Sequence, residues 1–312
     1  MQADRTNVKQ RILVLGAGEL GLAVLQGLAT KASEHAVSLS VLLRAQTIDS
    51  QAPGKRAELD KIREWGVAIE PADLVNADVL ALARIFERFD TVISCVGFAA
   101  GPGTQLKLCD AALQAGVKRF VPWQFGVDYD LIGRGSPQDL FDEQLDVRDR
   151  LRAQQRTGWI IISTGMFTSF LFEPSFGVVD LEQACVNALG SLETAVTVTT
   201  PEDIGQLTAA IVLHQPHIVN QVVYTAGDTL TYGELAALLE RVTHKPFKAR
   251  ARTVQQLHAD LALSPDDPMR KYRAVFAQGR GVAWGKAQTF NQQQGIKVTS
   301  AEQWALVNLK NR

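Results

Sequence analysis

The sequence is poor in cysteine, histidine and tyrosine. Its three cysteines, Cys95, Cys109 and Cys185, are odd in number and lack metal-ligand spacing. We therefore expect three buried free thiols, which suit a reducing cytoplasm. The five histidines form no recognisable metal-ligand cluster or Ser-His-Asp arrangement. These absences argue against a disulfide scaffold and give no support for a metal site or for serine-hydrolase chemistry.

Neither sign of charge is in excess, and no apolar run is long enough to cross a bilayer. The chain has 32 basic and 33 acidic residues, a balance that offers no concentrated positive field for nucleic acid or an anionic membrane. We interpret the basic pairs Lys55-Arg56 and Lys118-Arg119 as solvated surface. The most apolar long stretch, 159–172, is interrupted by polar residues, and residues 1–11 lack the apolar core of a signal peptide. We expect a soluble cytoplasmic monomer or homodimer with no nucleic-acid or membrane partner.

The N-terminal half alternates short β-branched runs with longer helical patterns. The predicted strands are 11–15, 37–43, 67–70, 91–96, 119–121 and 159–164. The predicted helices are 20–28, 55–65, 79–89, 104–115 and 139–155, with Gly66 and Gly116 as C-caps of the second and fourth. We predict an ordered loop over residues 128–138. Such alternation predicts parallel strands with crossover helices, and hence an α/β fold with a Rossmann-type doubly wound parallel sheet.

A glycine-rich turn, from Gly16 through Gly18 to Gly21, follows the first predicted strand and opens the first predicted helix. The first glycine permits the tight turn, the second lets the backbone approach a pyrophosphate, and the third allows close helix–strand contact. Unpaired N–H groups at the helix start favour the phosphates. We assign Gly16, Gly18, Glu19, Leu20 and Gly21 to a dinucleotide cofactor, the alternative being a glycine turn without a ligand.

The end of the second predicted strand distinguishes between the two nicotinamide cofactors. NAD-binding proteins usually place Asp or Glu there, to hold the ribose 2′-hydroxyl. Arg44 occupies this position, and a guanidinium suits a 2′-phosphate. Lys55 and Arg56 can reinforce it from the next helix. The sequence therefore predicts NADP(H), the alternative being that Arg44 is only a solvated strand end.

Two further strand ends fit the same cofactor position. Asp73 follows the third predicted strand, where it either lies beside the adenine or caps a helix. Residues 94–97 end the fourth, and we expect Val96 and Gly97 to line the ribose and nicotinamide side. We predict a Rossmann domain over residues 1–165, with a further core strand from 197–225. A smaller C-terminal substrate lobe, 166–312, is interleaved with it.

Three segments resemble a known family, the isoflavone-reductase-like and NmrA-like branch of the atypical short-chain dehydrogenases. Residues 117–126, Val-Lys-Arg-Phe-Val-Pro-Trp-Gln-Phe-Gly, resemble its "KRF-x-P-S-E-F-G" segment. Residues 164–167 resemble its "S-N-C-F" segment, with Gly165 in place of the asparagine, and residues 201–205 resemble its late "D-I-G/A" helix start. The resemblance covers roughly residues 10–230. It implies NADPH-dependent reduction of a small aromatic compound, with Gln124 and Phe125 beside the cofactor.

The resemblance also exposes a difference in the candidate catalytic residue. In the reductases of this family a lysine follows the "EFG" loop as general acid/base or to orient the nicotinamide. Aligning residues 141–148 on "F-E-x-K-A-x-V-R" places Gln144 at that position. Glutamine is no proton donor of useful pKa, but it hydrogen-bonds a carbonyl or carboxamide. None of the four tyrosines has lysine four residues on, so the usual Tyr-x-x-x-Lys pair is absent as well.

Other residues near the expected substrate carry two interpretations each. Asp128, Tyr129 and Asp130 are loop hydrogen-bonding residues, or one of them supplies a proton. The phenylalanines at 167, 170, 172 and 176 pack a core, or line a pocket for an aromatic substrate.

Three functions stay open on this evidence. The first is an NADPH-dependent reductase of a small aromatic or carbonyl substrate, with solvent or a residue outside the family pattern supplying the proton. The second is a non-enzymatic NADP(H)-sensing regulator of NmrA type, which the missing lysine suggests. The third is a sugar-nucleotide epimerase or dehydratase, which the missing Tyr-Lys pair disfavours.

Overall fold

The computed structural model describes residues 9–309, which fold into two compact units built from interleaved segments. Unit 1 holds residues up to Trp123, Asp146–Ile161 and Ile204–Val222. Unit 2 holds Gln124–Leu145, Ile162–Asp203 and the residues from Val223 onward. The domain boundary expected at residue 165 stays a prediction. None of the helices within residues 9–309 is long and apolar enough to cross a membrane.

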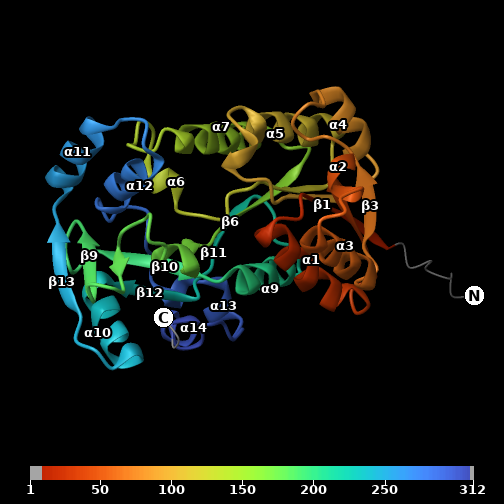
Figure 1. Cartoon of the computed structure of the whole chain (residues 1–312). Coiled ribbons are helices and arrows are strands. Elements are labelled where there is room, and N and C mark those ends of the chain that lie inside the picture. Colours follow the sequence, from red (N-terminus) through yellow and green to blue (C-terminus); the bar gives the residue numbers. More distant parts are fainter. Residues whose placement is uncertain (1–8, 310–312) are drawn as a thin grey trace, which may run out of the picture. The chain divides into compact units, whose positions relative to one another are not determined.

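Unit 1 is organised around a seven-stranded sheet of order β11-β6-β5-β4-β1-β2-β3 (Figure 1). Neighbouring strands pair in parallel throughout the part of this sheet that runs from β6 to β3. The strands are β1 (Gln10–Leu15), β2 (Val37–Leu43), β3 (Ala68–Pro71), β4 (Thr91–Ser94), β5 (Arg119–Val121), β6 (Gly158–Ser163) and β11 (Gln221–Tyr224). The order reverses between β1 and β4, where doubly wound sheets bind ligands. The predicted Rossmann-type α/β fold is confirmed.

Helices cover both faces of this sheet, as Figure 1 shows. The helices are α1 (Glu19–Ala32), α2 (Ala45–Ile48), α3 (Pro53–Glu64), α4 (Val79–Phe86), α5 (Thr104–Ala115), α7 (Leu140–Arg152) and α9 (Pro201–Val212). On the face of α4, α5 and α7, fully buried side chains such as Leu13, Leu108 and Val147 form one core. On the other face α1 and α9 touch through their backbones, since a Cβ on Gly205 would lie 2.1 Å from the carbonyl oxygen of Ala23.

Most of the predicted helices and strands are present near their predicted positions, and the differences concern where individual elements begin or end. Gly116 has φ of 62° and ends α5 as expected. Helix α4 stops at Phe86 rather than Phe89, and α7 spans fewer residues than 139–155. The loop expected over 128–138 contains a short helix, α6 (Tyr129–Ile132). Asp128 caps this helix, because its Oδ1 accepts hydrogen bonds from the N–H groups of Asp130 and Leu131.

Unit 2 contains two three-stranded sheets of order β12-β10-β7 and β13-β9-β8. Their strands are β7 (Met166–Phe167), β8 (Val179–Asp180), β9 (Cys185–Leu189), β10 (Ala195–Thr199), β12 (Asp228–Thr231) and β13 (Lys248–Arg252). The helices are α6, α8 (Thr168–Leu171), α10 (Tyr232–Thr243), α11 (Val254–Leu263), α12 (Pro268–Phe276), α13 (Phe290–Gln293) and α14 (Ala301–Asn308). Short 3-10 turns lie at Phe98–Ala100 in unit 1 and Lys286–Gln288 in unit 2.

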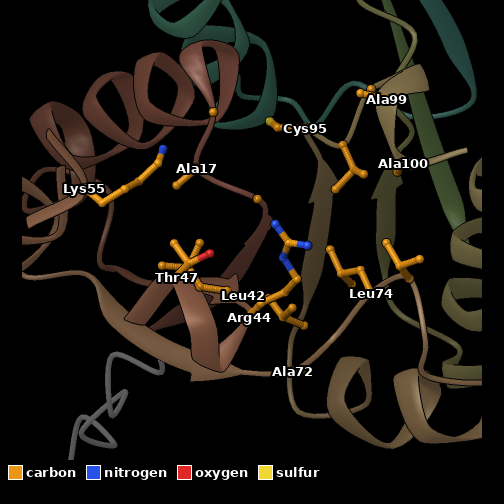
Figure 2. Close-up of a pocket in the computed structure, with 16 residues that line it drawn as sticks. Ala17, Leu42, Arg44, Thr47, Lys55, Ala72, Leu74, Cys95, Ala99 and Ala100 are labelled. Carbon is orange, nitrogen blue, oxygen red and sulfur yellow. The ribbon is translucent and has the colours of Figure 1, made fainter. Parts of the chain in front are cut away.

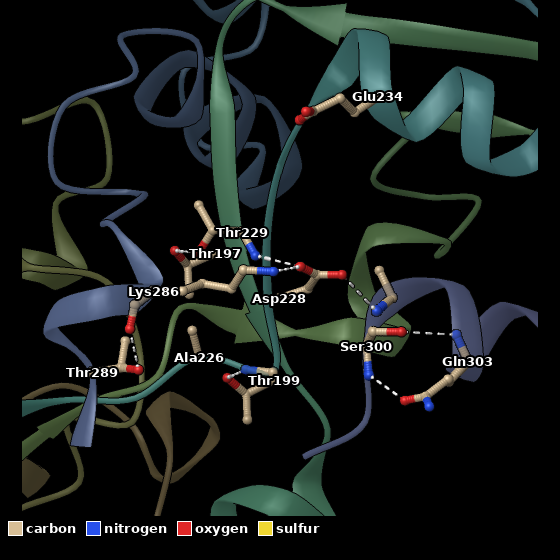
Figure 3. A network of polar contacts seen from close by, with 12 residues as sticks. Thr197, Thr199, Ala226, Asp228, Thr229, Glu234, Lys286, Thr289, Ser300 and Gln303 are labelled. Carbon is tan, nitrogen blue, oxygen red and sulfur yellow. Dashed lines mark hydrogen bonds and ion pairs between the residues drawn. The ribbon is translucent and has the colours of Figure 1, made fainter. Parts of the chain in front are cut away.

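Asp228 ties together three segments of unit 2 that are distant in sequence (Figure 3). Its Oδ1 accepts a hydrogen bond from Lys286 Nζ at 2.9 Å, and its Oδ2 accepts from the N–H of Ala301 at 3.2 Å. Beside it, the hydroxyls of Thr197 and Thr229 lie 2.8 Å apart across β10 and β12. These contacts fix the start of α14 against the β12-β10-β7 sheet.

Candidate cofactor site

Unit 1 has a cavity of about 420 Å³ at the carboxyl ends of β1, β2 and β4, beside the point where the strand order reverses (Figure 2). Four loops line it, one after each of β1 to β4. The lining residues are Gly16, Ala17, Gly18, Leu42, Leu43, Arg44, Thr47, Lys55, Ala72, Leu74, Val75, Cys95, Val96, Gly97, Ala99 and Ala100. Six of the predicted cofactor residues are among them, namely Gly16, Gly18, Arg44, Lys55, Val96 and Gly97.

The three glycines of the turn have three different environments. Gly16 has φ of +85°, which glycine adopts without strain. A Cβ on Gly21 would lie 2.2 Å from the carbonyl oxygen of Gly16, so helix and strand meet there without room for a side chain. A Cβ on Gly18 would meet no protein atom within 4 Å. Since Gly18 lines the cavity, its missing side chain leaves open space where a ligand fits.

The start of α1 borders this space with unpaired backbone donors. Gly18 is the N-cap and offers no side-chain acceptor, and the first intrahelical bond runs from the N–H of Leu22 to the Gly18 carbonyl. The N–H groups of Glu19, Leu20 and Gly21 therefore have no acceptor within the helix. Together with the positive end of the helix dipole they favour an anion. Leu20 is buried and Glu19 is exposed, and neither side chain lines the cavity.

The charged side chains that line the cavity, within residues 9–309, are both cationic. Arg44 extends into it from the end of β2, and Lys55 approaches from α3 (Figure 2). Lys55 Nζ forms an ion pair with Glu58 at 2.7 Å, a local contact within α3. Arg44 forms no ion pair with another residue of the described chain. A site with a free guanidinium and no carboxylate suits a phosphate better than a hydroxyl.

Asp73 lies in a turn and does not cap a helix, since the N-cap of the next helix, α4, is Asp78. Its Oδ1 accepts hydrogen bonds from the N–H groups of Val75 and Asn76, and its Oδ2 accepts from Asn76 Nδ2 at 2.8 Å. The hydrogen bonds from Asn76, followed by that from Val75 and the charge of Arg44, hold the pKa of Asp73 below its usual value. Asp73 does not line the cavity, whereas Leu74 and Val75, presented by this turn, do.

The loop after β4 is held from two sides. The Val96 carbonyl accepts a hydrogen bond from Gln105 Nε2 at 2.8 Å. A Cβ on Gly97 would lie 3.1 Å from the Trp123 ring, and that ring packs edge-on against Phe98 with centroids 4.6 Å apart. Cys95 is buried, and burial raises the pKa of its thiol, so it lines the cavity as a neutral apolar group. All three cysteines are buried and free, as expected.

The predicted site residues Gln124, Phe125 and Gln144 belong to unit 2, and their roles stay predictions. Gln124 Nε2 donates a hydrogen bond to the backbone carbonyl of Gln144 at 2.8 Å. The Gln144 side chain is fully buried, yet neither atom of its amide has a hydrogen-bond partner in the described chain. An unpaired buried amide costs stability, which makes it a candidate for contact with a ligand.

Two neighbouring features of unit 2 have structural explanations. Gly165 has φ of +72°, and a Cβ there would lie 2.1 Å from the Thr197 carbonyl oxygen, which excludes the family's asparagine. Asp128 is buried, and besides capping α6 its Oδ2 accepts a 2.6 Å hydrogen bond from the Tyr224 hydroxyl. Asp128 thus acts as a loop hydrogen-bonding residue, the first of the two interpretations that the sequence allowed.

Several aromatic residues of unit 2 form one packed cluster, whereas Phe172 stacks separately on Trp304 with ring centroids 4.7 Å apart. Tyr129 and Phe141 lie 5.0 Å apart, and Tyr272 contacts both Phe141 and Phe170 at 6.0 and 5.8 Å. Phe176 is fully buried 4.7 Å from Phe170. Burial raises the pKa of Tyr272 to about 12, so this phenol stays protonated near neutral pH. Phe176 is core packing, whereas Phe167 and Phe170 keep partial exposure.

The sheet order and the glycine-lined cavity define a Rossmann-type α/β protein with an anion-binding helix start. A sequence model of the NmrA-like family matches residues 8–280, and the chain belongs to this family. The resemblance seen in the sequence is thereby confirmed. The chain is 47% identical over 298 residues to an NmrA-like family domain-containing oxidoreductase of Gibberella moniliformis, a match that covers 95% of this chain and 97% of that protein.

Two solved structures share the fold across nearly the whole chain. An isoflavone reductase superposes with a TM-score of 0.81 at 21% identity, covering 97% of this chain and all of that one. The binary complex of leucoanthocyanidin reductase with NADPH from Vitis vinifera superposes with a TM-score of 0.76 at 20% identity, covering 94% and 97%. At these identities the likeness establishes the architecture.

Proposed function

We propose that the protein is an NADPH-dependent reductase of a small aromatic or carbonyl compound. The observation that carries the proposal is the cavity at the ends of β1, β2 and β4, in which Arg44 is the unpaired cation and no carboxylate lines the wall within residues 9–309. The relatives named above are an oxidoreductase and two reductases, one of them solved with NADPH, which favours catalysis over cofactor sensing.

Different lining residues of the cavity are proposed to bind different parts of this cofactor. The backbone at Gly16 and Gly18 and the N–H groups at the start of α1 receive the diphosphate. Arg44 and Lys55 receive the 2′-phosphate, and the apolar pair Leu74 and Val75 suits the adenine. When bound, NADPH supplies a hydride.

Gln144 is the residue that we propose for the substrate. Its buried, unpaired amide can donate a hydrogen bond to a substrate oxygen and so orient and polarise it. Glutamine transfers no proton at neutral pH, so the proton that balances the reduction comes from solvent.

The proposed activity is tested by following NADPH oxidation with a panel of aromatic alcohols, enones and quinones. We expect turnover with at least one member and a clear preference for NADPH over NADH, because Arg44 recognises the extra phosphate. NADP⁺ binding without oxidation of NADPH by any member would favour a sensing role instead. Failure to bind either phosphorylated dinucleotide would remove the basis of the proposal.

Gln144→Leu is expected to lower kcat/KM by about 10-fold to 30-fold, the effect of losing one hydrogen bond to a substrate oxygen. NADP⁺ affinity is expected to stay the same, and the free energy of unfolding to stay equal or rise, since an unpaired buried amide becomes an apolar group of similar shape. Steady-state kinetics and urea unfolding measure the two effects.

Gln138→Leu is the matched control. Gln138 is also buried in unit 2, and its amide likewise has no partner within residues 9–309, but it does not align with the family's lysine. We expect this variant to gain stability in the same way and to keep kcat/KM. Equal activity of the Gln144 and Gln138 variants would show that Gln144 does not contact the substrate.

A further inference from the structure

Unit 1 has a second cavity of about 420 Å³, at the amino ends of its parallel strands, opposite to the carboxyl ends that border the cofactor cavity. The residues at the amino ends of β1, β4 and β5 form one side of it, and the segment after α9 forms the other. Its lining consists of Lys9, Gln10, Asp90, Thr91, Lys118, Arg119, His217 and Val219. None of these residues belongs to the proposed cofactor site.

Arg119 is the unusual member of this lining. The sequence suggested that Lys118 and Arg119 are both solvated surface, and for Arg119 this prediction is wrong, because the residue is only 5% exposed. Its Nη1 donates a 2.8 Å hydrogen bond to the carbonyl of Val212, the last residue of α9. Its Nη2 is buried and has no hydrogen-bond partner within the described part of the chain. Desolvation lowers the pKa of Arg119, with the charge of Asp90 opposing it.

Asp90 lines the same cavity but does not pair with Arg119. Its Oδ2 accepts a hydrogen bond from the backbone N–H of Arg11 at 2.8 Å. Its Oδ1 forms an ion pair with Lys118 Nζ at 2.9 Å. Both oxygens are therefore engaged, and the charge of Asp90 acts on Arg119 without a direct contact. The buried Nη2 of Arg119 stays unpaired, which is costly unless a ligand accepts its hydrogen bonds.

The remaining polar groups of the cavity add donors. His217 Nδ1 lies 3.4 Å from Arg119 Nη1, and because arginine only donates, Nδ1 is the acceptor in this contact and Nε2 is the ring's donor. Gln10 Nε2 donates to the Thr91 hydroxyl at 3.0 Å. Lys9 is exposed at the rim and adds a positive charge.

We propose that this cavity is a binding site for a small phosphate-bearing anion, distinct from the cofactor site. The geometry provides a buried guanidinium with a free N–H group, an imidazole N–H donor and the charge of Lys9. Charge-assisted hydrogen bonds of this kind are the strongest that proteins offer to phosphate. The volume accommodates an organic phosphomonoester as well as inorganic phosphate.

The test is calorimetric titration of inorganic phosphate, and separately of phenyl phosphate, into protein saturated with NADP⁺. Saturation prevents either probe from entering the cofactor cavity. We expect millimolar or tighter binding of at least one probe, and tighter binding of phenyl phosphate identifies a phosphomonoester as the preferred source. Absence of binding by both probes at millimolar concentrations overturns the proposal.

Three variants locate the binding. Arg119→Met is expected to weaken it at least ~10-fold through loss of a charge-assisted hydrogen bond. Lys9→Glu changes an exposed residue and so leaves the fold intact, and it is expected to weaken binding ~5-fold by reversing a charge at the rim. Lys61→Met, on the exposed side of α3, is the control and should change nothing. If Lys9→Glu and a folded Arg119→Met bind phosphate like the wild type, the anion is bound elsewhere.

Discussion

Arg44→Ala is expected to weaken NADP⁺ binding about 100-fold while NAD⁺ binding changes less than about 2-fold, because only the 2′-phosphate needs the guanidinium. A bidentate contact to phosphate consists of two charge-assisted hydrogen bonds of about 1.5–3 kcal/mol each. Since about 1.4 kcal/mol corresponds to a factor of ten in affinity, even the lower value gives this loss. Fluorescence or calorimetric titration with both dinucleotides measures it.

The neighbouring cations make this experiment specific. Arg56 follows Lys55 on α3 but does not line the cavity, so Arg56→Ala should leave both affinities unchanged. Lys55→Ala should cost NADP⁺ less than Arg44→Ala, because Lys55 is already paired with Glu58. Equal losses of NADP⁺ and NAD⁺ affinity in Arg44→Ala would mean that Arg44 supports the cavity wall and does not contact the 2′-phosphate.

The parts of this fold that follow from the sequence are those with a strong local physical signal. Leu13 and Val14 lie in the buried C-terminal part of β1, and a run of apolar residues directly before a glycine turn is a specific pattern. Arg44 could be assigned to the cavity because the end of the second strand has a fixed place in a parallel sheet. The cap at Gly116 follows from the same kind of local rule.

The features that could not be predicted from the sequence depend on contacts between residues that are distant in the chain. Ala72, Ala99 and Ala100 line the cavity but carry no chemical signature, so only the fold reveals them. Arg119 looks like surface beside Lys118, and its burial follows from its hydrogen bond to the end of α9, which is distant in sequence. For Asp73, helix capping and cofactor contact are equal in sequence terms, whereas in the structure its hydrogen bonds with Val75 and Asn76 close a turn and Asp78 caps α4.

Replacing Gly18 and Gly21 by alanine should separate ligand binding from folding within one turn. In Gly18→Ala the new Cβ meets no protein atom and φ of −76° suits alanine, so the free energy of unfolding should stay equal or rise. NADP⁺ affinity should nevertheless fall at least ~30-fold, because the Cβ occupies the space that the diphosphate needs. In Gly21→Ala the Cβ lies 2.2 Å from the Gly16 carbonyl oxygen, and the backbone shift should cost about 3 kcal/mol of stability.

Urea unfolding of the protein without cofactor and titration with NADP⁺ together measure this contrast. Gly54→Ala is the control, since Gly54 lies in α3, its Cβ would meet no neighbour, and it does not line the cavity. It should gain stability from the better helix propensity of alanine and keep full affinity. If Gly18→Ala binds NADP⁺ as the wild type does, the diphosphate does not rest on this turn, and the cavity loses its proposed ligand although the fold around it is unchanged.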